Sequence, residues 1–354
     1  MYFHNKIFKA PSVKRFHLKC FQLLSQIFLK IPTSKIEIHI GKLLLPFIFL
    51  FLTLLANGQQ LPVIQQYILQ PSLLNPAITG SSECSQFRLM DRHQWLGFAG
   101  APKTQILTAE TVITPKTSSA SHGLGLHLHN DINGAQKQLG GSAIYAFHIY
   151  LNRRKTLKMG LGLSGTVYQQ AVDQRDFSPM PNSVNPDPVI NGNIIREFNF
   201  DASTGVYIYH KKFYIGFSAV QLLPYTSSFH PYTNTRSFYV YSGTIIPFRS
   251  QDFAFLPSVL YCFNQEGEMH IDLNPGLVYK DNYWIIISYR HLLNDFPGQP
   301  NSLVTYLGLN YKNFSFGYGF DIGLTALQKN HFGSHEFMVG YKICPYKCPC
   351  PAYR

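Results

Sequence analysis

The stretch LKMGLGLSGTV, residues 157–167, alternates residue types with a period of two. Its odd positions are apolar except for one glycine, and its even positions are Lys, Gly, Ser and Thr. Successive side chains of a β-strand point to opposite faces, so this stretch predicts a strand with one apolar and one polar face.

The same alternation recurs through the chain beyond residue 84. In residues 123–130, for example, Leu124, Leu126 and Leu128 oppose glycines and histidines. An even number of strands is typical of bacterial single-chain outer-membrane barrels. We predict fourteen strands, with ends good to about two to four residues: 85–94, 102–112, 122–130, 138–149, 156–170, 199–209, 212–221, 237–246, 253–261, 270–279, 282–290, 302–311, 314–321 and 334–342.

The gaps between these strands fall into two classes. Short gaps, at 152–155, 210–211, 280–281 and 312–313, alternate with longer ones, at 171–198, 222–236, 291–301 and 322–333. Outer-membrane barrels have short periplasmic turns and long extracellular loops. The pattern therefore predicts an all-β transmembrane barrel with both termini in the periplasm. A soluble β-sandwich is the second choice of fold, but it does not explain why short and long connections alternate.

Composition favours a membrane location. Only 14% of the residues are charged, against about 25% in soluble domains, and 15% are aromatic. Aromatic residues near the predicted strand ends fit the interfacial girdles of a barrel, although the β-propensity of aromatics explains some of them. These residues are Tyr145, Phe147, Tyr150, Tyr207, Tyr209, Phe213, Tyr214, Tyr283, Trp284 and Tyr289.

Much of the net charge of +12 belongs to a leader. Residues 1–58 contain eight Lys or Arg and one acid, so they supply +7 of it, and the dilute remainder argues against nucleic-acid binding. Lys42, the apolar run 43–55 and Ala56-Asn57-Gly58 have the order of a secretory signal, with Gln59 as the predicted mature terminus. The run is too short for a membrane helix, which makes an anchor the weaker alternative. Residues 1–41 are either a long basic region or lie before a non-Met start codon.

The cysteines give no metal site. Cys344, Cys348 and Cys350 crowd a proline-rich tail with no second cluster to complete a zinc site, and a periplasmic tail with one disulfide is the preferred interpretation. Cys84 and Cys262 stand apart in the sequence. We expect no cofactor and no metal.

No candidate enzyme motif in the sequence has the geometry that its chemistry requires. Ser334-His335-Glu336 cannot form a triad, because neighbours on a strand face opposite ways. His127 and His129 share a face but lack a third ligand, so we expect them to line the lumen. Gly123-x-Gly125 has no helix for a phosphate loop. The acids of 173–188 lack the spacing of a calcium loop. We therefore predict a protein that is not an enzyme.

Ordered motifs across residues 59–343 resemble the PorP/SprF family of Bacteroidetes. Single motifs are weak, but their order and spacing together are fairly specific. They are Gln66-Tyr67, Asn75-Pro76-Ala77, Gly80, Arg92-x-Gln94-Trp95-x-Gly97, Gly100-Ala101-Pro102-Lys103-Thr104, Gly123-Leu124-Gly125, Asn130-Asp131, Gly134, Gly205-x-Tyr207-x-Tyr209, Phe213-Tyr214-Ile215-Gly216, Gln221-Leu222-Leu223, Pro257-Ser258-Val259, Asp281-x-Tyr283-Trp284, Tyr289-Arg290, Gly333-Ser334-His335-Glu336 and Gly340-Tyr341.

The chain departs from the family pattern at Ile78-Thr79 and at Ile287-Ser288, and its tail is richer in cysteine. The resemblance implies an outer-membrane component of type IX secretion or gliding. It also implies partners: secretion-system lipoproteins, or the C-terminal sorting domain of an exported adhesin. An outer-membrane channel or hydrophobic-ligand transporter is the alternative function, and a secreted soluble binding module is a third.

These inferences divide the chain into four parts. Residues 1–58 are the leader, 59–84 a periplasmic or lumenal segment, 85–343 the barrel and 344–354 the tail. Residues 59–80 are too apolar to remain free in water, so we expect them to fold against or into the barrel. The longest gap has enough apolar area for a partner to bury, and its candidate contacts are Phe177, Met180, Val184, Val189 and Ile190.

Overall fold

The structure, a computed structural model, describes residues 65–113, 120–174, 193–223, 235–250, 252–294, 301–324 and 332–344. The leader and the tail beyond Cys344 lie outside these residues. Within the described residues no helix is long and apolar enough to cross a membrane.

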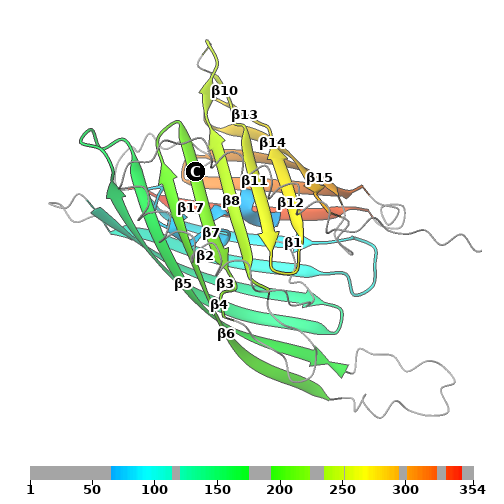
Figure 1. Cartoon of the computed structure of the whole chain (residues 1–354). Helices are drawn as coiled ribbons and strands as arrows, with labels where there is room; N and C mark the ends of the chain where they lie inside the picture. Colours follow the sequence, from blue (N-terminus) through cyan, green and yellow to red (C-terminus); the bar gives the residue numbers. More distant parts are fainter. Residues whose placement is uncertain are drawn as a thin grey trace, which may run out of the picture. The chain divides into compact units, whose positions relative to one another are not determined.

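The first half of the described chain forms three short helical turns and nine β segments (Figure 1). They are η1 (Gln65–Ile68), η2 (Pro71–Leu73), η3 (Pro76–Ile78), β1 (Ser85–His93), β2 (Lys103–Ile113), β3 (Ala120–Asn133), β4 (Gln136–Tyr150), β5 (Lys158–Asp173), β6 (Ile194–Tyr209), β7 (Phe213–Val220), β8 (Ser237–Thr244) and β9 (Ile246–Pro247).

The second half contributes eight more segments. They are β10 (Phe253–Phe255), β11 (Ser258–Asn264), β12 (Met269–Asn274), β13 (Gly276–Tyr279), β14 (Tyr283–Leu292), β15 (Ser302–Tyr311), β16 (Phe314–Gly323) and β17 (Ser334–Ile343).

The segments close into one antiparallel barrel. β1 pairs with β2 on one side and with β17 on the other, from Ser85 opposite Ile343 to His93 opposite His335. β8 with β9, β10 with β11, and β12 with β13 are halves of three strands, so the wall has fourteen strands. The predicted strand number and architecture are confirmed.

Prolines explain two of the three interrupted strands. Pro257 lies between β10 and β11, and Pro275 lies between β12 and β13. Proline has no backbone N–H and cannot donate to a ladder. The register continues unchanged across both breaks, as the pairs Phe255–Leu277 and Ser258–Asn274 show. The wall is therefore weakened locally without losing its closure.

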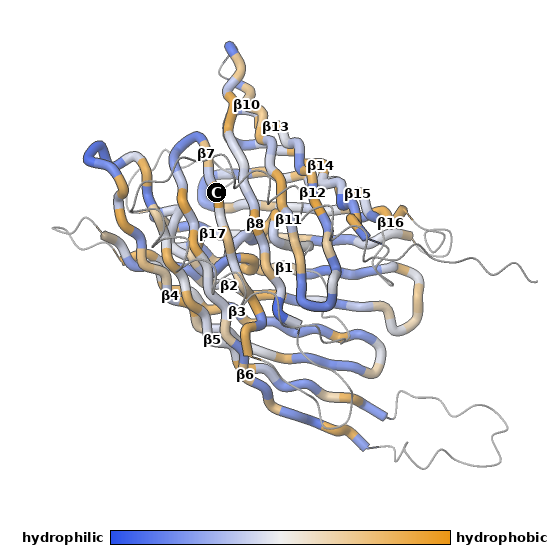
Figure 2. The backbone as a smooth tube through the Cα atoms, in the orientation of Figure 1, coloured by the Kyte–Doolittle hydropathy of each residue, from blue (hydrophilic) through white to orange (hydrophobic). Residues whose placement is uncertain are grey.

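The two faces of the wall differ as the alternation predicts. On β5, Leu161 and Leu163 are 43% and 63% exposed on the outside, while Ser164 and Thr166 line the lumen. Figure 2 shows apolar and polar residues alternating along the strands. An apolar exterior with a polar interior is the inverse of a soluble protein and suits lipid.

The two ends of the barrel differ in their connections. Ser85 and Ile343 lie at the end with turns such as 210–212 and 312–313, which we call the short-turn end. In the turn between β13 and β14, Lys280 and Asp281 both have positive φ, 50° and 57°, as a type I′ hairpin requires. The opposite, long-loop end carries the longest connections, between β5 and β6 and between β7 and β8, although the β3–β4 turn there has only two residues.

Two predictions from the sequence need correction. The longest gap is shorter than 171–198, because β5 continues to Asp173 and β6 begins at Ile194 with the alternation maintained. Five aromatics predicted for the girdles instead face inward. Three are buried, one packs against an interior cluster, and one shares the inward face of β4 with Ala146 and His148: Tyr207, Tyr209, Trp284, Tyr214 and Tyr150.

Glycines explain the inward aromatics. A Cβ on Gly308 would lie 1.9 Å from the Trp284 ring, and one on Gly243 would lie 2.4 Å from the Tyr214 hydroxyl. Each ring therefore occupies space that a side chain on the neighbouring strand would fill. This pairing depends on register between strands, which the alternation of one strand does not reveal.

Candidate functional site

Residues 65–84, which we call the plug, lie against the inner face of the barrel wall. Proline at the start of η2 and of η3 presets the first φ angle of each helical turn. Asn75 caps η3, since its side-chain oxygen accepts a hydrogen bond from the Ala77 amide at 2.8 Å. Leu74, Asn75 and Ala77 are at most 2% exposed. The family-like Asn-Pro-Ala motif is thus a buried structural turn.

Three glycines of the wall allow the plug to approach the wall backbone closely. A Cβ on Gly162 of β5 would lie 2.1 Å from the Ala77 amide nitrogen. On Gly123 of β3 it would lie 2.0 Å from the Thr79 carbonyl oxygen, and on Gly205 of β6 it would lie 2.0 Å from the Asn75 side chain. We call Gly123, Gly162 and Gly205 the glycine seat. No other residue type fits there unless the plug moves.

Hydrogen bonds hold the plug on this seat. The Asn75 side-chain nitrogen lies 3.0 Å from the Val206 carbonyl oxygen, 3.1 Å from that of Phe217 and 2.9 Å from the Tyr241 hydroxyl. Ser218 donates to the Leu74 carbonyl at 2.7 Å. Each of these buried contacts contributes about 1 kcal/mol, so one asparagine ties the plug to three strands.

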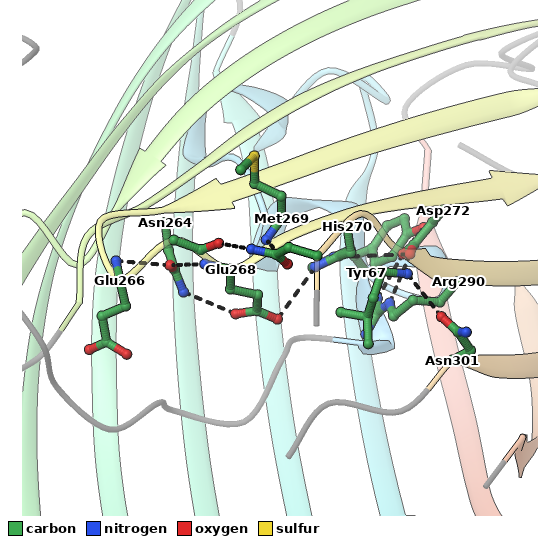
Figure 3. A network of polar contacts seen from close by, with 12 residues as sticks. Tyr67, Asn264, Glu266, Glu268, Met269, His270, Asp272, Arg290 and Asn301 are labelled. Atoms are coloured by element: carbon green, nitrogen blue, oxygen red, sulfur yellow. Dashed lines mark hydrogen bonds and ion pairs between the residues drawn. The ribbon is translucent and has the colours of Figure 1, made fainter. Parts of the chain in front are cut away.

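A buried ion pair on β12 and β14 also anchors the plug (Figure 3). Tyr67 donates to an Asp272 carboxylate oxygen at 3.1 Å. Arg290 binds both oxygens of Asp272, at 2.8 and 2.7 Å. The Asn274 amide also donates to the Tyr67 hydroxyl at 3.1 Å. Because the arginine fixes the carboxylate in a two-point geometry, the tyrosine meets a rigid acceptor.

A second ion pair lies inside the wall on β1 and β17. Arg92 lies 2.7 Å from Glu336 and 3.5 Å from Asp321, and Glu336 is 1% exposed. His335, next along β17, instead contacts the Tyr318 hydroxyl at 2.8 Å on the outer face. Ser334 and Glu336 point inward and His335 points outward, so the expected separation of these three residues is confirmed.

Another serine, histidine and glutamate do meet, where the plug touches β2 and β3. Ser72 lies 3.2 Å from His127 Nε2, and Glu110 approaches the same ring nitrogen at 3.3 Å. A catalytic triad places its carboxylate on the other ring nitrogen, where it orients the base. Here Ser72 also donates to Glu110 directly, and Gln70 donates to the same carboxylate. The cluster is a structural anchor of the plug.

Two cavities lie beside the plug in the part of the lumen that the structure describes. The cavity towards the long-loop end has a volume of about 260 Å³ and is lined largely by hydroxyls, amides and histidines, with Ser72 and Pro76 of the plug among them. The cavity towards the short-turn end measures about 140 Å³ and is lined largely by plug residues, tyrosines and aliphatic side chains. Ser72 borders both, so the plug contributes to the lining of each cavity.

Both histidines singled out in the sequence line the larger cavity. His127 contacts Ser72 and Glu110, and His129 contacts Gln138 at 3.1 Å. Within the described residues no group of three His, Cys, Asp or Glu has the arrangement of a metal site.

The cysteine pairing differs from the one expected. Cys84, which stands apart in the sequence, forms a disulfide with Cys344, 260 residues away. It joins the end of the plug to the end of β17. Cys262 is a buried free thiol in the lumen. Sequence spacing could not reveal the disulfide, because only closure of the barrel brings the first and last strands together.

The candidate partner contacts Phe177, Met180, Val184, Val189 and Ile190 lie outside the described residues. The strand ends that flank them are described. There Asp173 forms an ion pair with Lys137 at 3.1 Å. This residue belongs to the wall, contrary to its predicted place in a loop.

Alternation alone indicates that polar residues face the lumen. It does not identify Glu110, Asp272 and Tyr241 as residues that bind the plug, or Arg290 as the residue that holds Asp272. Their signal in the sequence is a charged or aromatic residue at an inward position of an otherwise small and polar face. Such residues are costly to bury without a partner, and the plug supplies several of the partners.

The closed wall, the apolar exterior and the filled lumen define an outer-membrane β-barrel. A family model described as type IX secretion system membrane protein PorP/SprF matches residues 56–341, and the chain belongs to this family. A search of curated protein sequences finds no match.

Solved structures of similar fold are outer-membrane barrels of very low sequence identity. BamA of Haemophilus ducreyi, lacking POTRA domains 1–3, is 10% identical over 73% of this chain and 70% of that chain, with a TM-score of 0.39. A TodX monoaromatic hydrocarbon channel mutant is 8% identical over 81% and 95%, with a TM-score of 0.41. Omp33 of Acinetobacter baumannii is 6% identical over 74% and 99%, with a TM-score of 0.42.

Proposed function

We propose that this type IX secretion membrane protein acts as a docking platform for other proteins of the system. The partners are secretion-system lipoproteins or the C-terminal sorting domain of an exported adhesin. The observation that carries the proposal is the plug, which lies inside the barrel and is tied to β2 and β3 on one side of the wall and to β12 across from them, with further hydrogen bonds to β6 and β7. A barrel filled by its own chain serves as a rigid scaffold.

The rival function is an outer-membrane channel or a transporter of hydrophobic ligands. It would require the plug to leave or rearrange, which would break the contacts of both Asn75 and Tyr67. Planar-bilayer recordings separate the two functions. A docking barrel gives no steady conductance, whereas reproducible open channels of the wild-type chain would favour transport.

Affinity purification of the mature barrel from its native membrane tests docking directly. We expect a large surface adhesin or secretion-system lipoproteins to co-purify. A matched sample carrying the Asn75→Ala substitution asks whether the seated plug is needed. Recovery of the barrel without either class of partner, from membranes that contain both, would contradict the proposal.

Partner contact is assigned to the long loops, on the basis of the apolar residues between 177 and 190. Deleting residues 179–191 should leave a heat-modifiable barrel in the membrane and abolish display of the exported partner. Normal display after this deletion would direct attention to the short-turn end.

The orientation follows from the same scheme. Both termini face the periplasm, and export removes residues 1–58. Mass spectrometry of the outer-membrane form should then find Gln59 at its N-terminus. An intact 43–55 segment in that form would contradict the assignment of a cleaved signal.

A further inference from the structure

The turns at the short-turn end are strongly basic. Five of these turns are described, and each carries at least one exposed Lys or Arg. The same turns contain only two carboxylates, Asp252 and Asp281. We call the eight cations the basic collar: Arg153, Arg154, Lys155, Lys211, Lys212, Arg249, Lys280 and Lys312.

The long-loop end has the opposite character where it is described. The β1–β2 connection, residues 94–102, and the β3–β4 turn contain no charged residue. The β11–β12 turn contains Glu266 and Glu268, and Arg236 is the one cation among the described residues of these connections. Among the described connections, the basic residues therefore gather at the short-turn end.

Two collar cations lie beside outward-facing aromatic rings. The Lys280 ammonium lies 5.2 Å from the centre of the Tyr279 ring, and that of Lys312 lies 5.3 Å from the Tyr311 ring. Tyr311 is 60% exposed on the outer face. Aromatic rings mark the boundary of the apolar band of a barrel. These ammonium groups are thus held on the perimeter, at the level where lipid phosphates lie.

We propose that the basic collar binds the phosphate groups of anionic phospholipids in the leaflet around the short-turn end. A lipid leaflet surrounds the barrel, so cations in every described turn suit it better than a single protein patch. The apolar band and its aromatic border place lipid directly beside Lys280 and Lys312. The collar then fixes which end of the barrel faces the phospholipid leaflet. This inference does not depend on partner docking.

Lipid retention by the full mature chain tests the collar. The barrel is purified in a neutral detergent and mixed with dispersed phosphatidylglycerol or phosphatidylcholine, and bound lipids are counted by native mass spectrometry. Each cation near an anionic surface is worth about fivefold in binding. The variant Lys280→Gln with Lys312→Gln should therefore lose about 25-fold in phosphatidylglycerol affinity and little for phosphatidylcholine.

A matched variant at the other end, Lys103→Gln with Arg196→Gln, should bind phosphatidylglycerol as the wild type does. Heat-modifiable migration verifies that both variants are folded. Two further probes separate other anions. If purified lipid A binds through Lys280 and Lys312 more tightly than phosphatidylglycerol does, the collar does not face the phospholipid leaflet. The variant could instead lose polyglutamate binding and keep its phosphatidylglycerol binding. That result would show that the collar binds an acidic protein and not a lipid.

Discussion

The glycine seat makes a sharp prediction about the plug. In Gly162→Val, the new Cβ would lie 2.1 Å from the Ala77 amide nitrogen, 2.4 Å from the Pro76 carbonyl carbon and 2.5 Å from the Ala77 Cα. Carbon atoms pack at about 3.5–4.0 Å. All three atoms belong to the backbone, so no side chain can rotate away, and η3 must lift from the wall by more than an ångström.

That displacement breaks the contacts of the Asn75 side chain with Val206, Phe217 and Tyr241. Each lost hydrogen bond is worth about 1 kcal/mol. The free energy that favours the seated plug therefore falls by about 3 kcal/mol, which raises the unseated fraction roughly a hundredfold. The wall itself should survive, because its ladder hydrogen bonds do not involve the plug.

Planar-bilayer conductance and limited proteolysis of residues 65–84 measure the unseated fraction. Gly162→Val should show channel openings that the wild type lacks and faster cleavage within the plug. Gly165 lies on the same strand, and a Cβ there meets nothing within 4 Å, so Gly165→Val is the matched control. If Gly162→Val remains as silent and as protected as that control, the plug does not close the lumen.

Three further substitutions probe the wall and its anchors. Leu161→Arg places a charge on the lipid-facing surface and should cost about 2–4 kcal/mol in urea unfolding, whereas Ser164→Arg, facing a cavity, should cost much less; equal losses would contradict the assigned faces. Arg290→Met removes the cation that binds both oxygens of the buried Asp272 carboxylate and should cost about 3–5 kcal/mol, against about 1 kcal/mol for Tyr67→Phe. Cys84→Ser should lower the free energy of unfolding by about 2–4 kcal/mol under oxidising conditions and leave it unchanged under reducing conditions. If the unfolding midpoint under oxidising conditions does not change, the disulfide is contradicted.

The parts of this fold that sequence could predict are those set by local alternation. The faces of residues 157–167 follow from side-chain geometry within one strand, and the even strand number follows from repeating that analysis. The inward direction of Ser334 and Glu336, opposite to His335, follows from the same rule.

The parts that sequence could not predict depend on register between distant strands. Trp284 faces inward over Gly308, which belongs to the neighbouring strand. Ser72 meets Glu110 and His127 only because the plug returns through the lumen. No single-strand pattern encodes either contact.

The disulfide between Cys84 and Cys344 has a consequence for biogenesis. β1 and β16 both present open edges until β17 emerges and pairs with them. The two thiols therefore meet only after the last strand has paired with both of its neighbours, and their oxidation marks the completion of assembly. Trapping free thiols at intervals after a pulse of synthesis would measure the fraction of chains with this disulfide, and so the time of the final assembly step in living cells.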